Sequence, residues 1–251
     1  MGYINYTIRG KTDGFGCQYN AIMSGIALCM NSTRPQLVYR HTPMRAVSHG
    51  CNVDILNDFI GLKDGTSQRK IHKAQAYSPK VFGCRQPSLF YTDRVIDSIR
   101  QKYWSTEKPD VERDNVSIHI RRGDVHNRAS YWRTRIRYVP NEFYASRIEC
   151  IANLYPNCKI SIHSEGRTED FSSITENLSR DILDRVDLKL NHDITETFHE
   201  MVASRALFMS RSGLSFTAGI LCEGDIFFQS GSRSIGQRWP LSHWNDWRSL
   251  D

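Results

Sequence analysis

Two adjacent arginines, Arg121 and Arg122, stand at the end of an apolar run that begins at Val116, and Gly123 and Asp124 follow them. The run predicts a buried strand, and ligands bind at the carboxyl ends of strands in open α/β sheets. Arginine is always charged and offers a planar fork of donors, which suits a phosphate group. A polar turn with a surface ion pair explains the same residues about equally well. Both interpretations stay open on these residues alone.

Polar residues also follow two later apolar segments of the chain. His163 and Glu165 follow the segment that begins at Cys158, and Ser210–Ser212 follow the segment 206–209. The carboxyl ends of parallel strands share one edge of a sheet, so we expect these residues on the edge that carries Arg121. His163 and Glu165 are therefore candidate contacts to a ribose or a base.

Side chains alternate between the two faces of a strand, and this alternation predicts the directions in which His119 and Arg122 point. His119 precedes it by two positions, so both side chains are expected on one face of the strand. His119 could contact a ribose or a phosphate, or it could be a core histidine that is satisfied by the backbone. Arg122 could likewise contact the ligand, or point away from it and pair internally.

A second candidate site lies near the N-terminus. Residues 3–9 predict a strand, and residues 17–31 carry small and apolar residues at helical spacing. Between them lies a loop with Asp13 and the tripeptide Gly14-Phe15-Gly16. Such a loop can point backbone N–H groups at an anion, which the dipole of the following helix also attracts. A tight turn with no ligand is the alternative.

The order of the predicted elements defines the fold class. Strands alternate with helices from about residue 115 to residue 228, which predicts an α/β fold with a parallel, doubly wound sheet. Residues 105–114 are charged and contain Pro109, and they form the best candidate for a linker.

Charge and composition limit the class of partner. The 251 residues carry a formal net charge of +6, which favours an anionic partner: a phosphorylated small molecule, a membrane surface or a nucleic acid. Six arginines fall between residues 121 and 137, together with Tyr131 and Trp132, a combination that can also hold single-stranded nucleic acid. Nucleic acid is the less favoured partner, because these arginines follow a strand end and do not cover a helix face.

Several other kinds of site lack a signal in the sequence. There is no apolar run of the roughly 18 residues that a membrane span needs and no signal-peptide pattern, so we expect a cytoplasmic protein. The seven scattered cysteines suit reduced thiols. No Asp-x-Asp pair is present for a divalent metal, and Glu223-Gly224-Asp225 is better explained as a turn. We therefore expect metal-independent chemistry, in which a fixed arginine and backbone N–H groups take the place of the ion.

Three of these segments, in this order, resemble motifs of the fucosyltransferase superfamily that includes the α1,2-, α1,6- and protein O-fucosyltransferases. They are Asp13–Gln18, His119–Asp124 and Ser210–Phe216. The resemblance implies a GT-B fold, with two Rossmann-like domains whose parallel sheets face each other across a cleft. The acceptor-side domain would span residues 1–108, the nucleotide-sugar domain residues 109–235, and a tail at 236–251 would pack back on the body.

The resemblance also implies an activity: inverting, metal-independent transfer of fucose from a GDP-sugar to a hydroxyl of a glycan or glycoprotein. No cofactor is implied beyond this donor, which is a co-substrate. Gly213 and Leu214 replace the more usual Thr-Phe, so another donor, such as UDP- or GDP-linked xylose, stays an alternative.

The resemblance assigns roles to individual residues. Arg121 would stabilise the diphosphate and Asp13 would be the general base, although Asp13 could instead cap the helix or close the turn. The remaining donor-binding residues would be Gly14, Phe15, Gly16, His119, Arg122, Asp124, His163, Glu165, Ser210, Ser212, Gly213, Leu214 and Ser215.

Overall fold

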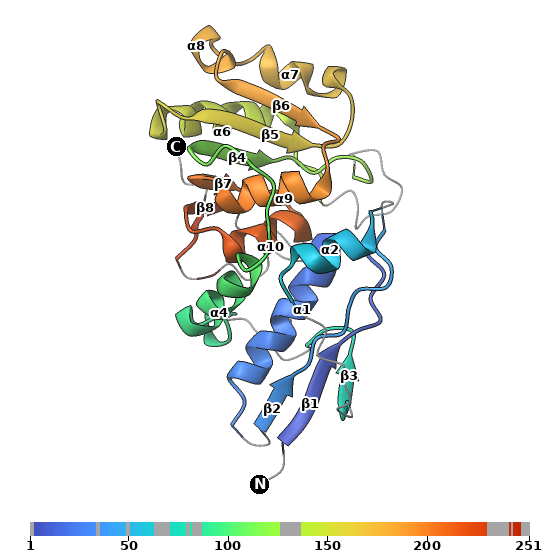
Figure 1. Ribbon diagram of the computed structural model, residues 1–251. Coiled ribbons are helices and arrows are strands. Elements are labelled where there is room, and N and C mark those ends of the chain that lie inside the picture. The colour runs from blue at the N-terminus through green and yellow to red at the C-terminus, as the bar shows by residue number, and fades with distance from the viewer. Residues whose placement is uncertain are drawn as a thin grey trace. The chain divides into compact units, whose positions relative to one another are not determined.

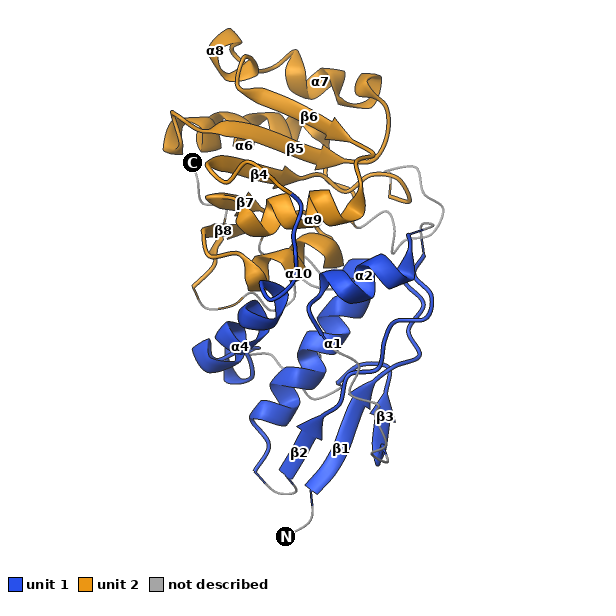
Figure 2. Ribbon diagram, in the orientation of Figure 1, with its two compact units in different colours: residues 1–109 blue, residues 110–251 orange. Residues whose placement is uncertain are grey.

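The chain forms two compact units in a computed structural model, residues 1–109 and residues 110–251 (Figure 2). Both units are α/β, and every strand pair recorded in their two sheets is parallel. The predicted α/β class with parallel sheets is therefore confirmed. The structure describes residues 3–33, 36–48, 51–62, 71–78, 81, 87–125, 137–229, 241 and 243–246.

Unit 1 is built on a parallel sheet with the strand order β2-β1-β3 (Figure 1). The long helix α1 packs so closely on this sheet that a Cβ at Gly25 would lie 2.6 Å from the Cγ1 of Ile8. Asn52 caps α2, because its side chain accepts from the N–H groups of Asp54 and Ile55. The elements are β1 (Tyr3–Ile8), α1 (Phe15–Met30), β2 (Gln36–Tyr39), α2 (Val53–Phe59), β3 (Lys73–Gln75), η1 (Pro87–Leu89) and α4 (Asp93–Tyr103).

Unit 2 is built on a larger sheet with the order β6-β5-β4-β7-β8-β9. β4 lies between β5 and β7, so the ends of three strands that carry polar residues are adjacent. The elements are β4 (Asn115–His119), α6 (Asn141–Leu154), β5 (Lys159–Ser164), η2 (Thr168–Phe171), α7 (Ser172–Thr175), α8 (Arg180–Leu183), β6 (Val186–Leu190), α9 (Ile194–Ala203), β7 (Ala206–Phe208), α10 (Gly213–Leu221), β8 (Asp225–Phe228) and β9 (Asn245–Asp246).

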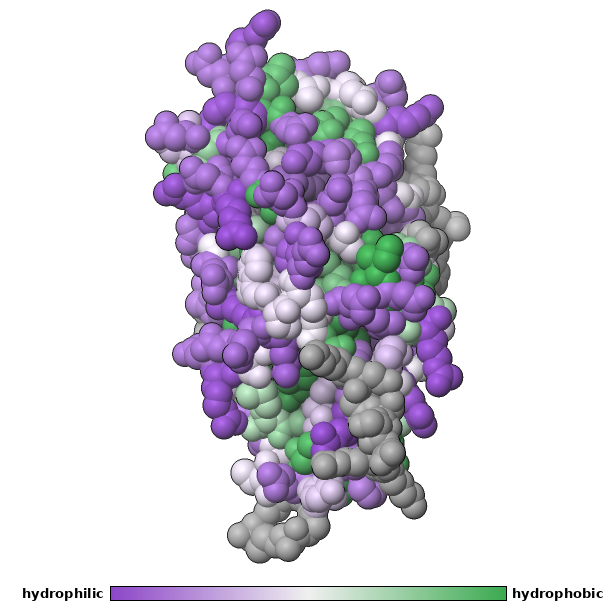
Figure 3. Space-filling view, in the orientation of Figure 1, coloured by the Kyte–Doolittle hydropathy of each residue, from purple (hydrophilic) through white to green (hydrophobic). Residues whose placement is uncertain are grey.

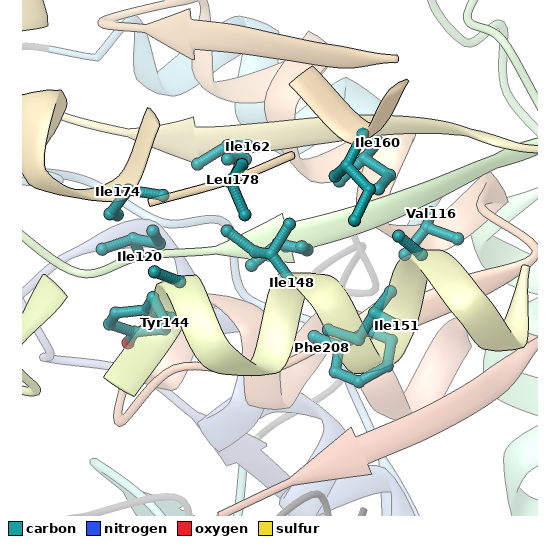
Figure 4. Close-up of a cluster of buried hydrophobic side chains, with 14 of the residues drawn as sticks. Val116, Ile120, Tyr144, Ile148, Ile151, Ile160, Ile162, Ile174, Leu178 and Phe208 are labelled. Atoms are coloured by element: carbon teal, nitrogen blue, oxygen red, sulfur yellow. The ribbon is translucent and has the colours of Figure 1, made fainter. Parts of the chain in front are cut away.

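One face of the unit 2 sheet carries the hydrophobic core (Figure 4). Val116, Ile118 and Ile120 point to this face from β4 and the residue after it, and they are fully buried against Ile148 and Ile151 of α6. Burial of each such side chain stabilises the fold by roughly 1.5–3 kcal/mol. The core therefore fixes β4 and with it the position of the arginines that follow the strand.

The opposite face of β4 and β5 is polar. Asn115, Ser117 and His119 alternate with the core residues of β4, and Ser161 and His163 lie beside the last two in β5. Helix α9 contacts β4 and α10 (Figure 1). A buried polar sheet face needs internal partners, and these partners define the candidate site described below.

The surface in the view of Figure 3 is mixed. Hydrophobic side chains form small scattered patches between hydrophilic ones. In the described part of the chain, no helix has both the length and the apolar character needed to cross a membrane.

Candidate anion-binding site of unit 2

Arg121 is held at the carboxyl end of β4 by two partners. Its Nη1 donates to the Oγ of Ser212 over 3.2 Å, and its Nη2 lies 3.0 Å from both carboxylate oxygens of Asp124. The side chain is 19% exposed. The Nε is buried, and its N–H has no acceptor among the described residues. A buried donor without an acceptor is expected where an anion or a water molecule completes a site.

Ser212 also begins helix α10. It is the N-cap residue, and its Oγ accepts from the N–H of Leu214 over 3.2 Å. The first N–H groups of a helix have no acceptor inside the helix, and they carry the positive end of its dipole. Gly213, Leu214 and Ser215 form this first turn. One serine hydroxyl thus joins the fixed arginine to a helix N-terminus, and both of these features attract anions.

Arg122 points the other way and is buried. Its Nη1 donates to the carbonyl oxygen of Arg121 over 2.9 Å, and its Nη2 donates to the carbonyl oxygen of Val139 over 3.0 Å and to Asn141. The guanidinium also lies 4.5 Å from the ring centre of Tyr138. These contacts favour the second alternative for Arg122, internal pairing that attaches the end of β4 to the start of α6.

His119 is paired with Ser210 across the boundary between β4 and β7. Its Nδ1 lies 2.9 Å from the Oγ of Ser210, and the side chain is buried. Burial, with the nearby positive charge of Arg121 and the neighbouring His163, lowers the pKa of His119 to about 3. His119 is therefore neutral near pH 7, so it can exchange hydrogen bonds with a ligand but adds no charge.

His163 belongs to a buried polar network under α9. Its Nε2 lies 3.4 Å from the Oγ of Ser117, and burial lowers its pKa to about 3. Glu200 of α9 accepts from the amide of Asn115 over 2.7 Å and from the Nζ of Lys189 over 2.8 Å. The Nδ1 of His163 is buried and has no partner among the described residues. The structure thus buries His163 in the polar network under α9, where Ser117 contacts its ring.

Gly123 and Glu165 meet where the ends of β4 and β5 approach each other. Gly123 has a positive φ of 69°, which disfavours other residues, and a Cβ there would lie 2.0 Å from the Oε2 of Glu165. Ser164 reinforces the junction by donating to the carbonyl oxygen of Ile120 over 2.6 Å. Glu165 is exposed at this edge. The glycine thus allows a carboxylate to lie against the turn that follows Arg121 and Arg122.

The glycine loop of unit 1 is a separate feature. Gly14 is the N-cap residue of α1, and no side chain caps that helix. The alternative in which Asp13 caps the helix is therefore wrong. The Asp13 carboxylate pairs instead with Lys11 over 2.8 Å and is 47% exposed. Gln18 donates to the carbonyl oxygens of Asp13 and Ala46, which fixes the loop. Phe15 and Gly16 are buried in the first turn of α1.

The structure gathers most of the predicted residues of unit 2 at one sheet edge. Arg121, Asp124 and the 210–215 segment are connected by hydrogen bonds, and His119 joins them through Ser210. Asn115, Glu200 and Lys189 were missed by sequence reasoning. The alternation of Asn115, Ser117 and His119 within the apolar run was the available signal of a polar sheet face.

Two further predictions concern metals and nucleic acid. No group of three or more His, Cys, Asp or Glu side chains lies close enough to hold a metal ion in the part of the chain that the structure describes. Most of the arginine-rich segment considered for nucleic acid, including Tyr131 and Trp132, lies outside the described residues.

Comparison with known proteins gives two distant structural likenesses among the matches found. No protein-family model matches the chain, and no curated protein matches its sequence. Its backbone is similar to that of the E. coli ADP-heptose LPS heptosyltransferase II, with 11% identity and a TM-score of 0.43 over 98% of this chain and 93% of that one. It is also similar to the E. coli heptosyltransferase WaaC with ADP, with 10% identity and a TM-score of 0.45 over 98% and 92%. Likenesses at this level say nothing about activity.

Proposed function

We propose that the protein is a glycosyltransferase that uses a nucleotide-diphosphate sugar and holds the diphosphate at the anion-binding site of unit 2. The observation that carries the proposal is the hydrogen bond between Arg121 and Ser212, which fixes a cation at the N-terminus of α10. The segments His119–Asp124 and Ser210–Phe216 resemble fucosyltransferase motifs, and this resemblance supports the same assignment.

The chemistry explains why this arrangement suits sugar transfer. When the bond to the sugar breaks, negative charge develops on the departing diphosphate and positive character develops on the sugar, as in glycoside hydrolysis. Donors that are already in place stabilise this charge without reorganising. Arg121 and the first N–H groups of α10 are such donors, and they could do so without a divalent ion.

The surrounding residues have supporting roles in this proposal. Asp124 holds the guanidinium of Arg121 by its Nη2 atom, and Ser210 holds the neutral ring of His119 beside it. His119 and Glu165 are candidate contacts to the ribose or the base. His163 and Arg122 are positioning residues, because both are buried and bonded within unit 2.

The finer assignment follows the sequence resemblance. We propose GDP-fucose as the donor, a glycan or glycoprotein hydroxyl as the acceptor, and direct attack with inversion at the anomeric carbon. Asp13 is the proposed general base, because its carboxylate is half-exposed and caps no helix. UDP- or GDP-linked xylose is the alternative donor.

Two measurements test the proposal. Thermal shift with GDP, UDP and ADP should show stabilisation by one nucleoside diphosphate, because a ligand that binds only the folded state stabilises it. A panel of nucleotide sugars, assayed for nucleotide release with and without glycan acceptors, then tests transfer. EDTA in a parallel assay should leave the rate unchanged.

The control is Arg121→Ala. It should weaken the thermal shift and reduce nucleotide release by about 10²–10³-fold while the variant stays folded. Stabilisation of the wild type and of Arg121→Ala to the same extent would show that the nucleotide binds elsewhere and would refute the proposed site.

A further inference from the structure

Unit 1 contains a groove that the proposed function does not use. It has a volume of about 850 Å³ and is lined by β2 and the residues next to it, by the second half of α1, by one side of α4, and by Gly61 and Leu62. We call it the β2 groove. All of its described lining residues belong to unit 1.

The backbone of β2 has one open edge in this groove. β2 is the terminal strand of its sheet, and no strand among the described residues pairs with its outer edge (Figure 1). Arg40 donates its N–H to the carbonyl oxygen of Tyr6 in β1 over 2.8 Å. Successive residues of a strand present their backbone groups to opposite edges, so Val38 also faces β1, while Leu37 and Tyr39 face outward. The groove therefore offers backbone donors and acceptors in strand geometry that no strand in the described part of the chain pairs with.

The opposite wall of the groove is one stripe of α4. Arg94, Ser98, Gln101, Lys102 and Ser105 line it, at the spacing of one helix face that continues past the helix end. Arg94 and Lys102 are eight positions apart, or about 12 Å at 1.5 Å per residue. A four-residue strand such as β2 has nearly the same length, about 13 Å. The distance along α4 between the two cations is thus about the length of one short strand.

Among the residues that the structure describes, the charged side chains of the groove are all positive. They are Arg40, Arg94 and Lys102, and no described lining residue is Asp or Glu. The recorded acceptors of the two arginines are neutral: Arg94 donates to the carbonyl oxygen of Met30 over 2.6 Å, and Arg40 donates to the side-chain oxygen of Asn5 over 3.2 Å. Carboxylates of a partner would therefore meet these three cations.

The remaining lining is largely apolar. Ile26 and Met30 contribute from α1, and Leu37 and Val38 contribute from β2. A strand that lies along β2 would present alternate side chains to these residues and to the cationic wall. Backbone pairing with pockets for alternate side chains is the usual arrangement when a peptide adds a strand to a sheet edge.

We propose that the β2 groove binds an extended acidic peptide segment, which pairs with the outer edge of β2 as an added strand. The proposal is independent of the glycosyltransferase assignment. It identifies the partner by three features: an extended backbone, alternate apolar side chains and at least one carboxylate at each end of a stretch of about four residues.

The test uses the full chain and a fluorescein-labelled octapeptide of alternating valine and glutamate. We expect saturable binding by fluorescence polarisation at low salt. In amide hydrogen exchange followed by NMR, the peptide should slow exchange at Leu37 and Tyr39 and leave Val38 and Arg40 unchanged, because these two already face β1.

Peptide controls separate strand pairing from attraction by charge alone. The same peptide with N-methyl groups on alternate amides keeps its charge but loses one row of donors, so binding should be lost. A peptide with lysine in place of glutamate should not bind. Equal binding of the N-methylated peptide, or exchange protection elsewhere without protection at Leu37 and Tyr39, would overturn the proposal.

Protein variants provide the matched comparison. Lys102→Glu should weaken binding by about three- to tenfold, because an attraction at the groove becomes a repulsion. Lys73→Glu makes the same change on β3, at the other edge of the sheet, and should leave binding unchanged. No binding by the wild type at low salt, or equal weakening by both variants, would refute the site.

Discussion

The guanidinium of Arg121 donates a hydrogen bond of 3.2 Å to the hydroxyl oxygen of Ser212, 91 positions later in the chain. This contact joins the carboxyl end of β4 to the N-terminus of α10. Arg122, the next residue, is buried and bonded to Val139 and Asn141. The two neighbouring arginines therefore differ in role: Arg121 belongs to the candidate anion-binding site, and Arg122 is bonded inside unit 2. Substitutions can separate the two roles.

Replacement of Arg121 tests the proposed chemistry. Arg121→Ala should reduce transfer by about 10²–10³-fold, because a preorganised donor to the leaving diphosphate is lost. The melting temperature should fall less than in Arg122→Ala, since part of the Arg121 side chain is exposed. Arg121→Lys keeps the charge but loses the planar fork, so it should recover part of the rate. The measurement is nucleotide release under saturating donor, with Arg180→Ala as an exposed control.

Replacement of Arg122 tests the structural role instead. Arg122→Ala leaves buried acceptors on Val139 and Asn141 without their donor, and it should lower the free energy of unfolding by about 1–3 kcal/mol. Urea denaturation of Arg121→Ala and Arg122→Ala side by side measures the contrast. A larger stability loss for Arg121→Ala would reverse the two assignments.

Two of the buried histidines, His119 and His163, make stability depend on pH. His119 and His163 each have a pKa lowered to about 3, against about 6.5 in an unfolded chain. Below about pH 6.5 the unfolded state binds more protons than the folded state, so stability is present at neutral pH and falls as the pH is lowered towards 3. Each histidine should contribute a slope of up to about 1.4 kcal/mol per pH unit in this window.

Urea denaturation between pH 7 and pH 5 measures this slope before most carboxylates titrate. His163→Gln should flatten the pH dependence by about one histidine's share. An unchanged slope in His163→Gln would mean that this histidine is not held neutral.

Much of the fold was predictable, because apolar and polar residues alternate along the central strand of unit 2 and so indicate its buried face. Val116, Ile118 and Ile120 mark one buried face, and helical spacing after each strand predicts a crossover and hence a parallel sheet. The same alternation places Arg122 on the core face with Ile120 and Arg121 on the opposite face with His119. It does not give the partners of Arg122, because Asn141 belongs to a helix whose contacts are set by the tertiary fold.

The polar face of the same strands was less predictable. Asn115 lies at the start of an apolar run, and its partner Glu200 lies 85 positions away in a helix. Burial of the Glu200 carboxylate would be unfavourable without partners, and Lys189 and Asn115 both donate to it. A contact between such distant segments has no local signature, so no spacing in the sequence indicates it. The β2 groove was missed for the same reason, because its walls come from four separate segments.

The final prediction concerns Asp13, the proposed general base. An acceptor hydroxyl is a weak nucleophile, and a carboxylate within hydrogen-bond reach can take its proton as the new bond forms. Asp13→Asn keeps the size of the side chain but removes this capacity, so transfer should fall by about 10²–10⁴-fold. The glycine loop should stay intact, because Gln18 bonds to the backbone carbonyl of Asp13 and not to its carboxylate.

Two controls make this result specific. Lys11→Ala removes the salt-bridge partner of Asp13 and should leave transfer within a few-fold of the wild type, since an exposed pair contributes little. Donor affinity by thermal shift and the melting temperature should be unchanged in Asp13→Asn. Turnover at the wild-type rate in Asp13→Asn would exclude the base role, and a lost thermal shift would instead assign Asp13 to donor binding.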